Sequence, residues 1–406
     1  MKAKKVLFFK KKLKNGITVI LEERKNSGVI SLAFAVKHGG IHEDKEIKGI
    51  SHFIEHMLYK GTKKRNSKEI SLEIEGKGGI LNGFTEEEIT AYWCKLPSEY
   101  LKTGLEVLGD MINNSKFDEK EMDKERKVIL EEIKMRRDTP QIRVYDEIQS
   151  LLYRGNLGLE IVGTPESLNS INREKIIKKF REVYTTNNLL LCAVGEVDFK
   201  TLCGFCEKNF SKSFKEIKSP RVELNKESRI EKQKGIGQVN LIFAHHTSKA
   251  GTREAYTAQV LNALLAGSMS SRLWQEIREK RNLAYAVKGS AHLGRNFGYN
   301  TIYVGTSPEN LELVKKIIVE EFKKLGKLGK KEFESAKTQL IGNSRIGRED
   351  SQGQMLDLLL NEVATKAEDS YMYEQNISKV KIEEVKKLAE KAINNFSILV
   401  LMPENE

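Results

Sequence analysis

The stretch "VISLAFAVKHGG" (29–40) has a counterpart about 210 positions later in the chain, "QVNLIFAHHT" (238–247). Both stretches are rich in β-branched and aromatic residues, which favour β-strands, and the first ends in glycines, as paired strands often do. Helical and strand patterns around the two stretches follow one another in the same order. A repeated order of elements at a fixed spacing predicts two homologous domains within one chain.

Three further pairs of segments support the duplication. They are the helical patterns 99–114 and 310–326, the charged helical patterns 119–133 and 330–344, and the apolar strands 187–196 and 394–403. One such match could arise by chance, but four in the same order indicate duplication. Strands in runs, mixed with amphipathic helices, predict α+β domains. We therefore expect two homologous α+β domains, each with helices packed on one face of a mostly antiparallel sheet.

The length of the chain agrees with two domains, because 406 residues exceed what one compact core usually holds. A polar and basic segment that contains Pro220 separates the two halves. We predict an N-terminal domain over 1–212, a linker over 213–232, and a C-terminal domain over 233–406.

The composition, with 39% hydrophobic and 31% charged residues, is typical of a soluble globular protein. The net charge of +12 is the one feature that favours nucleic-acid binding. However, lysines alternate with glutamates in segments such as 380–395, which is typical of a solvated helix face. The sequence shows no apolar run long enough to span a bilayer and no signal-peptide core. We expect a cytoplasmic protein that binds neither nucleic acid nor membrane.

Four cysteines in so long a chain do not make a disulfide framework, which agrees with a reducing compartment. Cys203 and Cys206 form one C-x-x-C pattern within a predicted helix. A structural zinc site needs a second pair, and a redox pair would begin a helix after a strand. We interpret both residues as inert thiols.

The segment "KGISHFIEHMLYKGT" (48–62) carries His52, Glu55 and His56 in the pattern H-x-x-E-H. Residues four apart share one face of a helix, so both imidazoles can reach the same ion. Glu55 lies next to that face, where it can act on a water molecule without binding the metal. The alternative is a helix whose histidines are hydrogen-bonded in the core. Zinc would need a third protein ligand and a fourth position open to water.

Two groups of carboxylates are candidates for the third ligand. Residues Glu86, Glu87 and Glu88 lie in a loop-like segment, whereas Glu125, Glu131 and Glu132 lie on the charged helix. Glu125 and Glu132 are two helical turns apart and share a face. One could bind the metal while the other orients a histidine, and the spacing does not say which.

The second half of the chain serves as an internal control. It contains His245, His246 and His292, none of them in an H-x-x-E-H pattern, and Asn343 stands where Glu132 falls in the first half. The fold therefore does not require the cluster of histidines and acids.

These residues resemble those of the pitrilysin/insulinase-like inverzincin metallopeptidases, most closely the short bacterial branch related to mitochondrial processing peptidase. That family has a glutamate downstream of H-x-x-E-H at the spacing of Glu132, within the pattern E-R-x-x-x-x-x-E that begins here at Glu125. The resemblance implies that His52, His56 and Glu132 bind one Zn²⁺ per chain. It also implies that Glu55 is the general base and that Glu125 supports a ligand.

Two further segments are similar to those of the same family. In "GGILNGFTEEEITAYW" (78–93), the resemblance implies that substrate lies along Asn82, Gly83, Phe84 and Thr85, although alanine is usual where Gly83 stands. In "SSRLWQEIREKRNLAYAV" (270–287), it implies that Arg278 and Tyr285 contribute to the zinc site. Without the resemblance, Asn82 would be read as a turn residue and Arg278 as a partner of glutamates on its helix.

The resemblance implies a zinc-dependent endopeptidase that hydrolyses unfolded peptides, bound as an extra strand inside a closed chamber of two chains. Because one chain carries both motifs, we expect a homodimer. The alternative is a catalytically silent structural or partner subunit, although such subunits typically lose a ligand or the base. The sequence leaves open the substrate, a processing or a scavenging role, and a related chain as the partner.

Overall fold

The computed structural model describes residues 6–404, which form two compact units. Unit 1 consists of the described residues up to 133 together with 159–220 and 347–370. Unit 2 consists of 134–158, 221–346 and the described residues from 371 onward. Each unit is therefore assembled from three separate segments of the chain.

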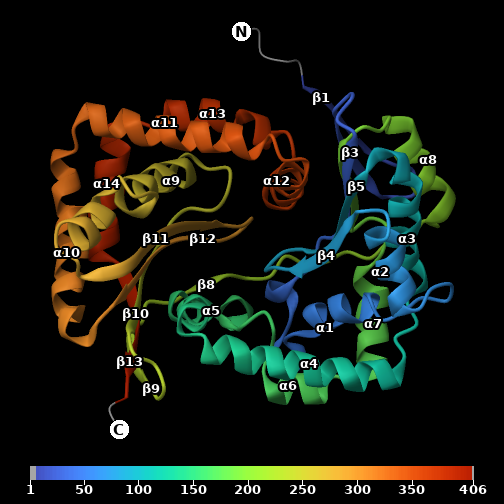
Figure 1. Cartoon of the computed structure of the whole chain (residues 1–406), viewed down its shortest axis with the longest axis horizontal. Coiled ribbons are helices and arrows are strands. Elements are labelled where there is room, and N and C mark those ends of the chain that lie inside the picture. Colours follow the sequence, from blue (N-terminus) through green and yellow to red (C-terminus); the bar gives the residue numbers. More distant parts are fainter. Residues whose placement is uncertain (1–5, 405–406) are drawn as a thin grey trace. The chain divides into compact units, whose positions relative to one another are not determined.

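Unit 1 is built around a six-stranded sheet with the order β1-β2-β7-β3-β5-β4 (Figure 1). Its strands are β1 (Leu7–Lys12), β2 (Thr18–Glu23), β3 (Val29–Val36), β4 (Ile80–Thr85), β5 (Thr90–Pro97) and β7 (Leu189–Gly195). Neighbouring strands are antiparallel except for β2 and β7, which are parallel. The order leaves β4 at one edge of the sheet, next to β5.

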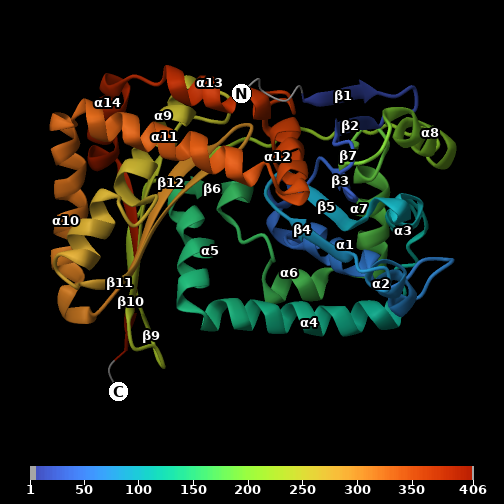
Figure 2. The same ribbon diagram turned by 45° about the horizontal axis from the view of Figure 1, so that its top comes forward.

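Helices cover both faces of the sheet in unit 1. They are α1 (Ile50–Leu58), α2 (Ser67–Glu75), α3 (Leu101–Asn114), α4 (Glu119–Asp138, which extends beyond the unit), α6 (Pro165–Ser170), α7 (Arg173–Val183), α8 (Phe199–Asn209) and α12 (Ser351–Ala364). Leu32 and Phe34 of β3 belong to the main core, which α3 helps to close. Because side chains alternate along a strand, Ser31 points to the other face, where its hydroxyl bonds that of Ser351 in α12. Figure 2 shows α12 and α8 on opposite sides of β3 and β7.

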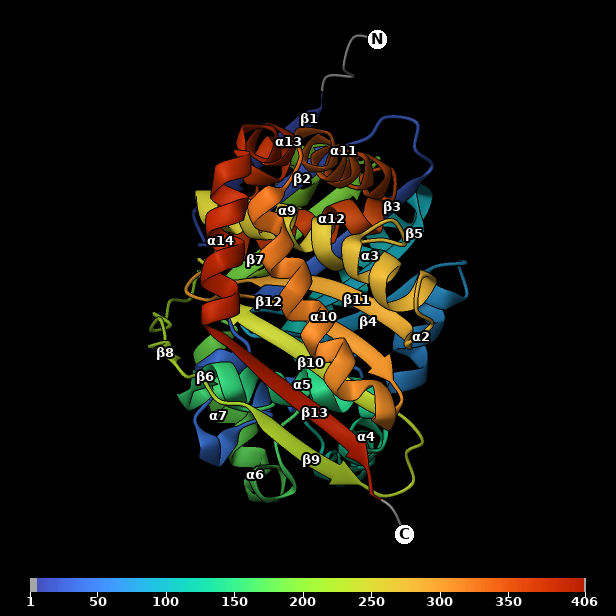
Figure 3. The same ribbon diagram turned by 90° about the vertical axis from the view of Figure 1, so that its left-hand side faces the viewer.

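Unit 2 contains a five-stranded sheet with the order β11-β12-β10-β13-β9, and Figure 3 shows β13 and β9 side by side with α10 in front. Its strands are β9 (Arg229–Gln233), β10 (Val239–His246), β11 (Ala284–Leu293), β12 (Gly298–Thr306) and β13 (Phe396–Pro403). The short strands β6 (Tyr153–Arg154) and β8 (Glu223–Leu224) form a separate pair. Here too one pair, β13 and β9, is parallel and the others are antiparallel.

Helices also cover both faces of the sheet in unit 2. They are α5 (Pro140–Leu152), α9 (Arg253–Ala266), α10 (Leu311–Lys324), α11 (Lys330–Gly347), α13 (Asp369–Lys379, whose first two residues belong to unit 1) and α14 (Ile382–Asn394). Leu241 and Phe243 of β10 belong to the core with residues of α10 and α14. On the opposite face α5 contacts β10 and β13, and its Tyr145 ring stacks on Tyr303 at 5.8 Å.

Each half of the sequence contributes one helix to the unit formed mainly by the other half. Helix α5 lies in the first half of the chain but packs on the sheet of unit 2, and α12 lies in the second half but packs on the sheet of unit 1. Strands β3, β7, β10 and β12 are consequently buried on both faces, as their almost unbroken burial shows. The amphipathic pattern of α12 reveals an apolar face but not the sheet that receives it.

The predicted fold class is confirmed. Strands β2-β7-β3-β5-β4 of unit 1 follow the same order as β9-β13-β10-β12-β11 of unit 2, and β1 is an addition. We predicted helices on one face of each sheet, and α3 and α10 lie on that face. The exchanged helices, α12 in unit 1 and α5 in unit 2, cover the other face. The segment predicted as a linker, 213–232, contains β8 and most of β9. Charged residues such as Arg229 and Glu231 suit a strand at the edge of a sheet, although they resemble a linker in the sequence.

Within residues 6–404, no helix has both the length and the apolar character that a membrane span requires.

Candidate metal centre

Helix α1 holds the H-x-x-E-H residues, and its first turn is fixed by a buried carboxylate. Glu43, which is fully buried, accepts hydrogen bonds from the backbone N–H groups of Gly49 (2.9 Å) and Ser51 (2.7 Å). A negative charge at a helix N-terminus is favourable because it faces the positive end of the helix dipole. Gly49 has φ = +91°, and a Cβ there would lie 2.6 Å from the carbonyl oxygen of Val162. The start of α1 is therefore tightly determined.

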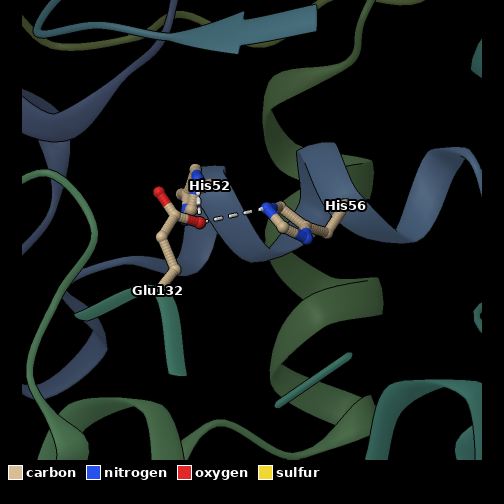
Figure 4. Close-up of side chains that lie close together, drawn as sticks. All are labelled: His52, His56 and Glu132. Atoms are coloured by element: carbon tan, nitrogen blue, oxygen red, sulfur yellow. Dashed lines mark ion pairs between the residues drawn. The ribbon is translucent and has the colours of Figure 1, made fainter. Parts of the chain in front are cut away.

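Side chains of α1 and α4 meet at three potential metal ligands, shown in Figure 4. The Nε2 atoms of His52 and His56 each lie 3.7 Å from Oε2 of Glu132. One ligand atom from each residue lies within 4.8 Å of the others. Ligands of a tetrahedral zinc ion, each about 2 Å from the metal, are roughly 3.3 Å apart. Two imidazoles and one carboxylate are also a donor set that zinc accepts, so these residues fit the metal.

His56 is held in place through its other ring nitrogen. Its Nδ1 lies 3.1 Å from Oε2 of Glu125, and Oε1 of Glu125 lies 2.6 Å from Nζ of Lys60. Burial alone would raise the pKa of Glu125, but the hydrogen bonds from His56 and Lys60 lower it overall. An ionised carboxylate can only accept, so Nδ1 carries the proton and Nε2 keeps its lone pair towards Glu132.

Glu55 is 8% exposed and lies on the same turn of α1 as His56. Its Oε2 accepts a hydrogen bond of 2.6 Å from the hydroxyl of Thr85 in β4. Burial raises the pKa of Glu55 to about 7, against the opposing effects of the Thr85 hydrogen bond and of His56, whereas Glu132 raises it further. A carboxyl group with a pKa near neutrality can both accept and release a proton.

Residues Asn82, Gly83, Phe84 and Thr85 all lie in the edge strand β4, where Gly83 pairs with Tyr92 of β5. Asn82 is thus a strand residue and not a turn residue, and its Oδ1 accepts a hydrogen bond from the N–H of Gly83. Helix α1 contacts β4. The edge of β4 that faces away from β5 has no neighbouring strand in this sheet, so it can pair with another strand. The hydroxyl of Thr85 is committed to Glu55.

The structure separates the candidates for the third ligand. Within residues 6–404, the one group of three side chains close enough to hold a metal is His52, His56 and Glu132, so Glu131 is not part of it. The loop acids Glu86, Glu87 and Glu88 are not part of it either. Backbone carbonyls of Glu86 and Glu87 instead bond the N–H groups of residues 40 and 41.

Arg278 and Tyr285 lie close together in unit 2. Arg278 belongs to a π-helix, Trp274–Glu279, and its guanidinium stands 4.3 Å from the ring of Trp274 and 5.3 Å from the ring of Tyr285. Strand β11 has a bulge between Ala284 and Ala286, which leaves Tyr285 76% exposed. π-Helices and bulges often occur at functional sites because they redirect side chains. The helix glutamate Glu276 pairs with Lys280 and Arg281, so Arg278 is not its partner.

Sequence reasoning missed two kinds of contact residue. Trp274 precedes Arg278 by four positions, so helical spacing was the signal that could have identified it. Lys60 lies in the turn after α1 and contacts Glu125 of α4, so spacing along one helix does not identify it. The cysteines of the C-x-x-C pattern lie on α8, where burial raises the pKa of both the Cys203 and the Cys206 thiol. Thiols of this kind are poor nucleophiles and poor metal ligands at neutral pH.

Known proteins resemble both halves of the chain. The model described as "Insulinase (Peptidase family M16)" matches residues 18–165, and "Peptidase M16 inactive domain" matches residues 170–340. The uncharacterized zinc protease YmxG of Bacillus subtilis (strain 168) is 33% identical, over 84% of each chain. An uncharacterized zinc protease of Rickettsia felis is 36% identical, over 83% of each chain.

Solved structures share the fold. A protease from Helicobacter pylori has a TM-score of 0.90 at 21% identity, covering 98% of this chain and 100% of its own. A putative M16-like peptidase from Alicyclobacillus acidocaldarius has a TM-score of 0.84 at 19% identity, covering 98% and 99%. With matches to both halves and relatives at this identity and coverage, the chain belongs to the M16 (insulinase) peptidase family, in its short two-domain branch.

Proposed function

We propose that the chain is a zinc-dependent endopeptidase with Glu55 as its general base. One observation supports the proposal above all: ligand atoms of His52, His56 and Glu132 lie within 4.8 Å of one another, next to the buried Glu55. The names of the relatives, zinc proteases, support the same reaction class.

His52, His56 and Glu132 would hold the metal, one ion per chain. Zinc bound there would polarise the scissile carbonyl and make water a better nucleophile at neutral pH. Glu125 would keep His56 oriented, because its carboxylate fixes the proton on Nδ1. Lys60 in turn holds Glu125.

Glu55 would take a proton from the attacking water and deliver it to the leaving amine nitrogen. Burial raises the pKa of its carboxyl to about 7, which suits both steps. The Thr85 hydroxyl fixes Oε2, so Oε1 would be the oxygen that receives the proton.

Substrate would bind as an added strand along the outer edge of β4, through backbone hydrogen bonds. The backbone N–H and C=O groups of β4 that point away from β5, on alternate residues among Asn82, Gly83, Phe84 and Thr85, would supply the main-chain partners. We assign Arg278 and Tyr285 as substrate ligands because the family resemblance implies it: Arg278 for a substrate carbonyl, Tyr285 for the scissile carbonyl oxygen. Backbone recognition predicts loose sequence selectivity and a preference for unfolded peptides.

We further propose that two copies of the chain form a homodimer in the cytoplasm and that this homodimer encloses the substrate. One chain carries both the H-x-x-E-H motif and the Arg278–Tyr285 pair, so two identical chains need no other subunit. Light scattering of the active protein tests the stoichiometry, and a fully active monomer would contradict it. A silent partner subunit is less favoured, because this chain has kept the base and all three candidate ligands.

Metal content and peptide cleavage, measured on the same preparation, test the proposal. We expect about one zinc per chain, cleavage of a quenched unfolded peptide, loss of cleavage with chelator and recovery with zinc. Bound zinc without cleavage across a peptide panel would favour the silent subunit. A protein that takes up no zinc would refute the proposal.

A further inference from the structure

Tyr59, the C-cap residue of α1, lies one helical turn after Glu55 and on the same side. Its ring packs beside that of Tyr92, with the centroids 6.1 Å apart. The hydroxyl oxygen of Tyr59 is buried and has no hydrogen-bond partner within residues 6–404. A buried hydroxyl without a partner is unfavourable, so its position calls for a physical reason.

Gly83 of β4 makes room for this hydroxyl. A Cβ at position 83 would lie 2.6 Å from Oη of Tyr59, 3.0 Å from the carbonyl oxygen of Ala91 and 3.2 Å from Oε1 of Glu55. The Tyr59 hydroxyl therefore fills the space that a methyl group would take.

The same space borders the base. The site of the missing Cβ is within 3.2 Å of both Tyr59 Oη and Glu55 Oε1, whereas Oε2 of Glu55 is bound by Thr85. The position of the missing Cβ thus adjoins both the Tyr59 hydroxyl and the Glu55 oxygen that Thr85 does not bind. The Tyr59 hydroxyl has a proton that it donates to no group within residues 6–404.

We propose that Tyr59 is a positioning residue for Glu55, admitted to the site by Gly83. Its hydroxyl fills the space that Gly83 leaves beside Oε1 and so limits the rotation of the Glu55 carboxylate. The catalytic part of this inference rests on the proposed peptidase function. The packing part, that residues 59 and 83 form a coupled pair, does not.

A double-mutant cycle tests the pair: wild type, Tyr59→Phe, Gly83→Ala and the double variant. Urea midpoints are measured on the metal-free proteins. Gly83→Ala should lower the midpoint because its methyl collides with the hydroxyl. Tyr59→Phe should remove that collision and leave only the contacts with Ala91 and Glu55. Gly83→Ala should therefore lower the midpoint less in the Tyr59→Phe background than in the wild type. Additive effects would overturn the pairing.

Unit 2 supplies a matched control. Gly289 of β11 faces Asn262 and Ala266 of α9, in the way that Gly83 faces Glu55 and Tyr59. Gly289→Ala should also lower the urea midpoint. Tyr59→Phe should not rescue it, and a rescue would show that the effect at Gly83 is not specific.

Zinc content and steady-state kinetics test the positioning role. Tyr59→Phe should keep one zinc per chain and an unchanged KM, while kcat falls about tenfold, because a misaligned catalytic group slows the chemical step. The double variant should match Tyr59→Phe in kcat rather than show the product of two losses. An unchanged kcat in Tyr59→Phe would overturn the role. A wild-type protein without cleavage would refute the peptidase proposal, while the urea cycle would still decide the pairing.

Discussion

Unit 1 and unit 2 share a strand order but differ at the position of the candidate metal centre. Phe34, Tyr92 and Gly83 are neighbours across β3, β5 and β4, just as Phe243, Ile302 and Gly289 are across β10, β12 and β11. Both glycines face a helix, namely α1 at Glu55 and Tyr59 in unit 1, and α9 at Asn262 and Ala266 in unit 2.

This correspondence puts Asn262 at the place of Glu55. Counting along the helices then puts Gln259 and Ala263 at the places of His52 and His56. Unit 2 retains the glycine and the close helix approach, but its helix carries amides and a methyl group. The shape of the site is therefore a property of the fold, and its chemistry depends on a few side chains.

Separating the halves of the sequence should disrupt unit 1. A chain of residues 1–212 lacks α12, whose Met355, Leu358 and Leu359 are fully buried. Burying each such side chain contributes about 2 kcal/mol, and a whole domain is stable by only about 5–15 kcal/mol. We expect no cooperative urea unfolding by circular dichroism. The control is residues 1–220 joined by a flexible linker to 347–370, which should unfold cooperatively. Cooperative unfolding of 1–212 at the midpoint of the full chain would contradict the expectation.

Glu132→Gln should weaken zinc binding more than roughly 100-fold. Removing a group that only orients a metal ligand already lowers metal affinity by up to about that factor. Competition with a chromogenic chelator measures the affinity. The matched variant in unit 2 is Asn343→Ala, which should bind zinc as the wild type does. Equal zinc affinities for Glu132→Gln and wild type would remove Glu132 from the ligand set.

The substitution Glu55→Gln places an amide in unit 1 at the position that Asn262 occupies in unit 2. We expect zinc to be retained and kcat to fall roughly 10²–10⁴-fold, as loss of a general base usually does. Single-turnover cleavage measures the chemical step, with Glu131→Gln on α4 as a control that should stay active. Near-normal turnover in Glu55→Gln would refute the role of Glu55.

Buried histidines should make unit 2 sensitive to acid. Burial lowers the pKa of His245 to about 4, from an ordinary value of 6.5. Between these values the unfolded state binds the proton and the folded state does not, so stability falls as the pH drops from about 6.5 to 4. The loss is at most about 3.4 kcal/mol. His245→Asn should flatten the dependence of the unfolding free energy on pH over this window. An identical slope in both proteins would contradict the prediction.

Sequence reasoning predicted the fold class because the strands and helices repeat with recognisable patterns. It did not predict the exchange of α5 and α12, since an amphipathic helix shows which of its faces is apolar but not which sheet covers it. The boundaries 1–212, 213–232 and 233–406 describe the halves of the sequence and stay a prediction.

The candidate site was partly predictable for a similar reason. Spacing on one helix placed His52 and His56 together, but it left Glu125 and Glu132 equivalent because both share a face of α4. Tertiary packing separates them: Glu132 lies near both Nε2 atoms, and Glu125 lies at Nδ1 of His56. The coupling of Tyr59 to Gly83 depends on contacts between α1 and β4, which spacing along one element does not reveal.

The helix exchange also sets an order of events during synthesis. The last strand of the first sheet, β7, ends at Gly195, but α12 ends at Ala364. A ribosome that adds about 5–20 residues per second needs roughly 10–30 s to cover that distance. Throughout this interval the apolar face of β3 and β7 that α12 will cover is exposed on the nascent chain. Chaperone binding should therefore be strongest on chains arrested between these two points.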